Sequence, residues 1–234
     1  MNHPNVLIGC PVNEIKSYCM DDYFHALFNL SYPNKDFYFV DNSEDKYWHI
    51  KNVIMGYGVQ VDYVSPTGKR NNQILCECQN MLRHKALTEG YDYLFMVECD
   101  LMVTPNIIEK LMAYGEQVAV ARYFLGTNEG NTHLIGTEIE KNYGIGVKTN
   151  RNIGWLEDYL SYGTGETRGS SFGFGCALFS KEVLSLTPFF LHPDFKDHAD
   201  TTASFYYHEN GIKIAIDSEI MIHYNQNWRH ISNY

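Results

Sequence analysis

The 234-residue sequence lacks features that mark several common protein classes. No apolar run approaches the length of a bilayer, and Asn2, His3 and Pro4 interrupt the start, so we expect neither a membrane span nor a secretory signal. With 18 Lys and Arg against 28 Asp and Glu, the formal net charge of −10 argues against a broad nucleic-acid footprint. None of the six cysteines forms a C-x-x-C pair, which favours buried free thiols in a reducing, cytoplasmic compartment over a zinc site.

Internal repeats, low-complexity tracts and a recognisable linker are also missing, so we expect a single domain over residues 1–234. The glycine-rich run Gly163–Gly169 follows no predicted strand and has no Lys-Ser/Thr ending, which excludes a P-loop. Aromatic residues, in contrast, are abundant, with 18 Tyr and 13 Phe. Tyrosine suits half-apolar, hydrogen-bonding surfaces such as sugar-binding and peptide-binding sites.

Apolar runs and helical spacings alternate along the chain, which predicts an α/β fold with a mostly parallel, doubly wound sheet and helices on both faces. In the first part of the chain, up to residue 112, the pattern predicts strands at 5–10, 36–40, 59–64 and 93–97 and helices at 23–30, 47–56, 72–89 and 106–112. The second part predicts strands at 117–121, 172–180, 212–216 and 219–223 and a helix at 200–209. The Gly-, Thr- and Asn-rich stretch from Leu125 to Ser171 predicts small strands and a mobile surface segment.

The most informative stretch is the apolar run Tyr93–Val97, which predicts a strand buried on both faces. Glu98 and Asp100 follow it directly, and Pro105 begins a helical pattern. Ligands bind at the carboxyl ends of strands in open α/β sheets, and two acids there would need solvation or a counter-charge. A divalent cation would supply that charge, and it would bring a phosphate with it. Alternatively, the two acids flank a solvated turn and cap the next helix.

Four separated segments, in this order, resemble the GT-A glycosyltransferases, in particular the family-2-like enzymes. Two strand ends carry Pro11-Val-Asn-Glu14 and Asp41-Asn42-Ser43, and a helix with Asn80 and Arg83 precedes the acidic Glu98-Cys99-Asp100, which is similar to a DXD motif. The third segment carries two glycines, in Gly173-Phe-Gly175. The fourth consists of Ala199-Asp200, a predicted helix, Gly211 and finally His223. Together the segments span the chain from about Val6 to Tyr224.

This resemblance implies a nucleotide-binding half over about residues 1–115 and an acceptor-binding half over about 116–234. It implies a nucleotide-sugar donor, with UDP-sugar favoured, and Mn²⁺ or Mg²⁺ on its diphosphate. The metal ligands it implies are Asp100 and His223, with Glu98 on the ribose or a metal-bound water. The residues that it implies for the donor are Pro11, Asn13, Glu14, Asp41, Asn42, Arg83, Glu98, Cys99, Asp100, Gly173 and Gly175.

For catalysis, the resemblance implies an inverting transfer in which Asp200 takes the proton of the acceptor hydroxyl, with Asp197 as the substitute base. In a retaining enzyme Asp200 would instead hold the donor sugar, and without any such role it would simply cap a helix. Possible sugar-stacking side chains are Tyr123, Trp155, Tyr162 and Trp228.

The acceptor is left open between a glycan, a protein, a small molecule and a modified DNA base. Two other functions also stay open at this stage. One is a nucleotidyltransferase acting on sugar phosphates, although that class opens with a Gly-rich basic loop where this chain has Pro11-Val-Asn-Glu14. The other is a non-catalytic carbohydrate-binding protein on the same fold.

Overall fold

The computed structural model describes residues 3–45, 59–126, 132–135, 137–138, 165–167, 170–191, 198–225 and 228–231. Its helices are η1 (Glu14–Cys19, a 3₁₀ helix), α1 (Met20–Phe28), α2 (Asn71–Thr88), α3 (Ile107–Ala113), α5 (Lys181–Leu186) and α6 (Ala199–Glu209). Its strands are β1 (Val6–Val12), β2 (Lys35–Asp41), β3 (Gln60–Tyr63), β4 (Tyr93–Val97), β5 (Leu101–Met102), β6 (Val118–Gly126), β7 (Thr132–Ile135), β8 (Thr137–Glu138), β9 (Gly165–Thr167), β10 (Ser170–Ser171), β11 (Cys176–Ser180), β12 (Ile214–Asn225) and β13 (Trp228–Ile231).

The central sheet runs in the order β13-β12-β6-β11-β4-β1-β2-β3. Strands β3, β2, β1 and β4 are mutually parallel, as are β6 and β12, so the predicted mostly parallel α/β sheet is confirmed. Strand β11 lies antiparallel to both β4 and β6, and the short strands β5, β7, β9 and β13 also pair antiparallel with their neighbours. Strand β11 therefore separates the predicted nucleotide-binding strands from the β6–β12 pair.

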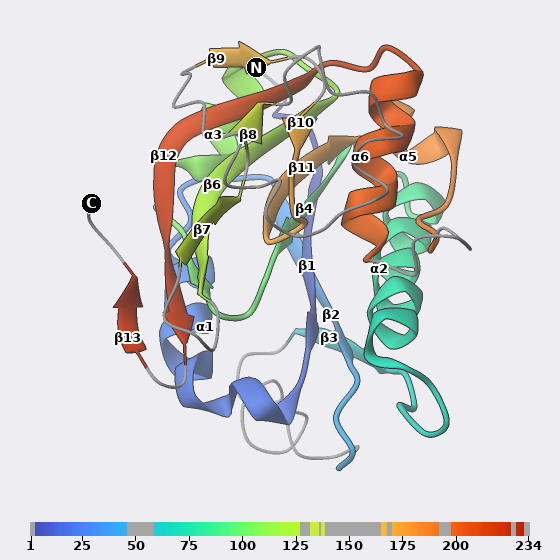
Figure 1. Cartoon of the computed structure of the whole chain (residues 1–234), viewed down its shortest axis with the longest axis vertical. Coiled ribbons are helices and arrows are strands. Elements are labelled where there is room, and N and C mark those ends of the chain that lie inside the picture. Colours follow the sequence, from blue (N-terminus) through green and yellow to red (C-terminus); the bar gives the residue numbers. More distant parts are fainter. Residues whose placement is uncertain are drawn as a thin grey trace.

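Helices cover both faces of the sheet, with α1 and α3 on one side and α2, α5 and α6 on the other (Figure 1). Alternate residues of β1 point to opposite faces of the sheet. Val6 and Ile8 pack into the core beneath α1 and α3, and Leu7 packs into the core beneath α2, α5 and α6. Gly9 permits the close approach of α2, because a Cβ there would lie 2.6 Å from the Leu82 side chain. These two packed layers hold the carboxyl ends of β1, β2 and β4 at a common edge.

Strand β12 differs from the sequence prediction, which placed two strands at 212–216 and 219–223. The structure has one long strand whose register shifts between Asp217 and Ile220. The Asp217 carboxylate accepts the backbone N–H of Glu219 at 2.7 Å, which stabilises this irregular turn of the strand. Before the shift β12 runs parallel to β6, and after it the strand also pairs antiparallel with β5, placing His223 opposite Leu101.

All six cysteines are free, and five of them are buried. No helix within the described ranges is long and apolar enough to cross a bilayer. The helix predicted at 47–56 lies outside the described residues, as does most of the stretch between Leu125 and Ser171. Short strands β7, β8, β9 and β10 account for the described parts of that stretch.

Candidate active site

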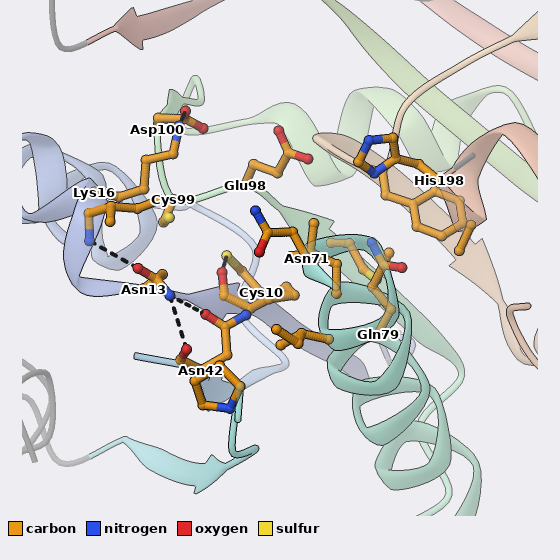
Figure 2. Close-up of a pocket in the computed structure, with 18 of the residues that line it drawn as sticks. Cys10, Asn13, Lys16, Asn42, Asn71, Gln79, Glu98, Cys99, Asp100 and His198 are labelled. Atoms are coloured by element: carbon orange, nitrogen blue, oxygen red, sulfur yellow. Dashed lines mark hydrogen bonds and ion pairs between the residues drawn. The ribbon is translucent and has the colours of Figure 1, made fainter. Parts of the chain in front are cut away.

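A pocket of about 650 Å³ lies at the carboxyl ends of β1, β2 and β4. Figure 2 shows its main side chains, with Asn13 and Asn42 below Glu98 and Asp100 in this view and His198 on the far side. The lining comes from the segments after three parallel strands together with α2 and the start of α6. Its residues include Cys10, Pro11, Asn13, Glu14, Lys16, Asn42, Gln79, Glu98, Cys99, Asp100, Phe174, His198 and Asp200.

The acidic turn after β4 is held by backbone hydrogen bonds. The N–H of Glu98 donates to the carbonyl of Gly175 at 2.8 Å, and the N–H of Leu101 donates to the carbonyl of Glu98 at 2.9 Å. The N–H of Tyr224 then donates to the carbonyl of Asp100 at 2.8 Å, which joins the turn to β12. The geometry of the two acids is therefore determined by β11 on one side and β12 on the other.

Asp100 and His223, predicted from separate segments, meet at this turn. Nε2 of His223 lies 3.1 Å from Oδ2 of Asp100, and both residues are buried. His223 approaches the carboxylate from β12, and it does not itself belong to the pocket lining. The His223 hydrogen bond and the Lys16 charge outweigh the burial of Asp100, so the pKa of this carboxyl is lowered and it stays ionised.

Lys16 is a site residue that the sequence analysis missed. It projects from η1 and forms an ion pair with Oδ2 of Asp100, the same oxygen that His223 contacts. Burial alone would lower the pKa of this amine, yet the Asp100 charge reverses the effect and raises the pKa. A lone lysine between two predicted elements has no pattern of its own, and the only available signal was its position two residues after Glu14 at the strand edge.

Glu98 points into the pocket beside Asp100 (Figure 2) and is open to solvent there. Although Glu98 is exposed as a whole residue, the pocket surrounds its carboxyl group, and this burial together with the Asp100 charge raises its pKa to about 7, against a smaller opposing effect of His223. Asp200 raises the pKa of Glu98 further, so the two acids are electrostatic neighbours across the pocket.

We predict that Glu98 makes the metal-free protein lose stability as the pH rises. Folding raises the pKa of Glu98 from 4.5 to about 7, so the folded state binds this proton more tightly than the unfolded chain. The resulting stabilisation is complete below pH 4.5 and is lost as the pH rises through about 7. Thermal melts of Glu98→Gln without metal should show a flatter decline over this range than wild type, and an unchanged slope would contradict the shift. Glu89→Gln, at the exposed end of α2, serves as the control.

Asp200 lies in the first turn of α6 and lines the pocket. Its Oδ1 accepts the N–H of Thr201 at 2.7 Å, while His198 occupies the N-cap position without a side-chain capping bond. Burial raises the pKa of the Asp200 carboxyl, although the nearby His198 and the Thr201 N–H oppose the rise. Asp200 is thus a residue of the first helical turn with its carboxylate at the pocket. Asp197 lies outside the described residues.

The residues predicted for the nucleotide gather on one side of the pocket. The amide nitrogen of Asn13 donates to both the side-chain and backbone oxygens of Asn42, at 2.7 and 3.0 Å, and thereby ties the ends of β1 and β2 together. Pro11 and Glu14 also line the pocket. Asp41 lies beneath it, fully buried, with its Oδ1 accepting the N–H of Ser43 at 2.8 Å. Asp41 therefore shapes the end of β2 rather than lining the cavity.

The structure does not bring Arg83 to the pocket. Nε of Arg83 donates to the carbonyl of Leu184 at 2.7 Å and fixes α5 against α2, so Arg83, which the resemblance implied for the donor, packs two helices together instead. Asn80 acts similarly, because its amide pairs with the backbone N–H and carbonyl of Phe189 at 3.0 and 2.7 Å.

The two glycines near β11 are likewise buried away from the cavity, and only Phe174 between them lines it. A Cβ on Gly175 would lie 2.6 Å from the ring of Tyr123, so this glycine makes room for a buried aromatic side chain. Gly175, which the resemblance implied for the donor, therefore lies outside the pocket lining. Gly173 is buried beside it.

Of the proposed stacking residues, Tyr123 is buried, with its ring edge-on to His223 at 5.9 Å between centroids. Trp155 and Tyr162 lie outside the described residues. Trp228 lies on β13, of which the structure describes the backbone.

The spacing of the side chains at Asp100 is compatible with a divalent cation. Two adjacent ligands of an octahedral ion with bonds of about 2.1 Å lie about 3 Å apart. The 3.1 Å between Oδ2 of Asp100 and Nε2 of His223 matches that spacing, and carboxylate with imidazole suits Mn²⁺. Within the described ranges, no cluster of three or more His, Cys, Asp or Glu side chains has metal-binding geometry. The pair therefore fits a cation whose remaining ligands come from a bound phosphate and water.

The chain matches no protein-family model, and no curated protein matches its sequence. Its structure, in contrast, is similar to solved glycosyltransferases. S. aureus TarS (residues 1–349) in complex with UDP-GlcNAc aligns with a TM-score of 0.56 at 12% identity, over 92% of this chain and 56% of TarS. The same TarS fragment with UDP aligns at a TM-score of 0.57 and 11% identity, over 92% and 58%.

A mannosyltransferase from Pyrobaculum calidifontis, solved with GDP-Man and Mn²⁺, aligns at a TM-score of 0.53 and 12% identity, over 93% of this chain and 57% of that enzyme. The chain thus spans little more than half the length of these neighbours. At such low identity the likeness establishes the fold alone, which this chain shares with these glycosyltransferases. The predicted fold resemblance is confirmed.

Proposed function

We propose that the protein is a metal-dependent glycosyltransferase that moves a sugar from a UDP-sugar to an acceptor hydroxyl. The observation that carries this proposal is the meeting of Asp100 and His223 beside the pocket at the ends of β1, β2 and β4. The fold neighbours solved with UDP-GlcNAc and with GDP-Man and Mn²⁺ support the same class of donor. In this assignment residues 1–115 hold the nucleotide and residues 116–234 complete the acceptor side.

Each group in the pocket has a proposed task. Pro11, Asn13, Glu14 and Asn42 border the base and ribose, and Glu98 faces the ribose or a water molecule. Asp100, with His223, would hold Mn²⁺ or Mg²⁺, which when bound stabilises the negative charge that grows on the leaving diphosphate. Cys99 lies between Glu98 and Asp100 in the acidic turn and also lines the pocket, so we place it beside the donor.

Asp200 is proposed as the base of an inverting transfer. Its carboxylate takes the proton of the acceptor hydroxyl while that oxygen bonds to the anomeric carbon and the bond from that carbon to the UDP oxygen breaks. Burial supports this role, since the raised pKa of Asp200 makes its ionised form a stronger base than an exposed aspartate. Phe174 and His198 border the pocket near Asp200 and would face the sugar or the acceptor.

We predict that UDP-sugars stabilise the protein only when Mn²⁺ is present. A ligand at about 100 times its dissociation constant adds about 2.7 kcal/mol to the unfolding free energy, equivalent to about 5–10 °C in Tm for a chain of this size. Differential scanning fluorimetry with a panel of UDP- and GDP-sugars, with Mn²⁺ or with a chelator, measures the effect. Equal stabilisation by a sugar in the chelator would contradict metal dependence.

The products separate the enzyme from the two alternative functions. A glycosyltransferase releases UDP from the stabilising donor, by transfer or by slow hydrolysis. A nucleotidyltransferase would consume or release pyrophosphate, and a binding protein would show the stabilisation without any product. Chromatography of the nucleotides after incubation with Mn²⁺ distinguishes the three outcomes.

A further inference from the structure

Lys16 neutralises the Asp100 charge from the pocket side. Its ammonium contacts Oδ2 of Asp100, while His223 contacts the same oxygen from β12. The Asp100 side chain is only 4% exposed, whereas that of Lys16 is 34% exposed and lines the pocket. Oδ2 of Asp100 is therefore in contact with both a buried imidazole and a partly exposed lysine, and the lysine is the contact that faces the pocket.

A divalent cation at Oδ2 would have to approach from the same open side. It could not share that oxygen with an ammonium group at contact distance, because the two positive charges would repel each other strongly in a recessed site. Lys16 is partly exposed on a flexible four-carbon stem, so its amine can leave Asp100 by rotating into the pocket. There the diphosphate of a bound nucleotide would offer it new oxygen acceptors.

We infer that Lys16 is an exchangeable counter-ion, which neutralises Asp100 in the metal-free protein and binds the donor diphosphate once a divalent cation has replaced it. This inference rests on the proposed function and adds a binding residue that the resemblance to glycosyltransferases did not imply. It has two opposite consequences for one side chain: Lys16 weakens the binding of the metal alone and strengthens the binding of nucleotide with metal.

The two consequences are measured with Lys16→Met, which keeps much of the stem and removes the charge. Mn²⁺ titrations followed by electron paramagnetic resonance, without nucleotide, should show Mn²⁺ binding about tenfold more tightly than to wild type, because the competing charge is absent. Calorimetric titration of UDP in saturating Mn²⁺ should show binding weakened about tenfold, through loss of a charged hydrogen bond. The control is Lys110→Met, which removes the partner of Glu219 in an ion pair between α3 and β12, outside the pocket.

Unchanged Mn²⁺ affinity in Lys16→Met, with Mn²⁺ bound by wild type, would overturn the inference and leave the proposed function intact. Weaker Mn²⁺ binding would overturn it too, because Lys16 would then position Asp100 for the metal. Absence of Mn²⁺ binding by every variant, with and without UDP, would overturn both the inference and the metal role.

A measurement on wild type keeps the test independent of the folding of Lys16→Met. Acetylation of Lys16 by an amine-reactive ester, followed by peptide mass spectrometry, should be slow without metal. It should accelerate several-fold when Mn²⁺ is added alone, and slow again when UDP joins it. Equal rates in the three conditions would show that the ion pair never opens, which contradicts the exchange.

Discussion

Replacing Asp100 by Asn should lower sugar transfer by about 10²–10³-fold, the cost usually found when one preorganised electrostatic group is removed from an active site. Asn retains the shape of the side chain but carries no charge, so it would hold Mn²⁺ poorly and leave the ammonium of Lys16 without its partner. The Mn²⁺-dependent rise in Tm with UDP-sugar should disappear together with turnover.

Steady-state kinetics and thermal melts with and without Mn²⁺ check this expectation. Asp62→Asn is the matched control, because Asp62 also accepts a side-chain hydrogen bond, from Tyr38 at 2.7 Å, yet lies outside the pocket lining. Circular dichroism shows whether the Asp100 variant is folded. A folded variant with wild-type turnover and an unchanged response to Mn²⁺ would remove the basis for a cation at this turn.

The second large effect is expected at the other end of the pocket. Asp200→Asn should lower the transfer rate by about 10²–10⁴-fold, which is the usual contribution of a positioned general base. Donor affinity should change little, since Asp200 is separate from the strand ends assigned to the nucleotide. The amide of Asn cannot take up the acceptor proton, although its oxygen can still accept the N–H of Thr201.

Comparing the Kd of the UDP-sugar with the rate constant for transfer separates binding from catalysis in this variant. Asp21→Asn provides the control, because Asp21 is an exposed acid in the first turn of α1. A large increase in donor Kd at an unaffected transfer rate would reassign Asp200 to holding the donor sugar, as expected of a retaining enzyme. Reduced helix stability without either effect would leave it as a helix-terminus residue.

The parts of this fold that could be predicted are those with a repeating pattern. The run Tyr93–Val97 and the long helical spacing of α2 were placed within a residue or two, because buried strands and amphipathic helices have clear hydrophobic signatures. The direction of β11 was not predicted, because an apolar run has the same composition whether its neighbours are parallel or antiparallel. The long strand β12 was divided in two because polar Asp217 and Ser218 interrupt its apolar residues.

The candidate site divides in the same way. Glu98, Asp100 and Asp200 could be predicted because acids at the ends of strands and helices can be recognised in a sequence. The resemblance to glycosyltransferases then implied a role for each of them. The role of Lys16 and the packing role of Arg83 could not be predicted, because each depends on a tertiary contact. Lys16 contacts Asp100, and Arg83 contacts the carbonyl of Leu184. The two-residue strand β5 also lacks a sequence signal, although it is the element that pairs with β12 beside Asp100.

That pairing has a consequence for the order in which the protein folds. In the proposed nucleotide-binding half, β4, which precedes Asp100, can pair with β1 once the first half of the chain is available, whereas His223 reaches Asp100 only after β12 has docked on β6 and β5. Contacts between such distant parts of a chain form slowly because a long loop must close first. A refolding experiment should therefore recover nucleotide-half structure before it recovers the capacity to retain a metal ion.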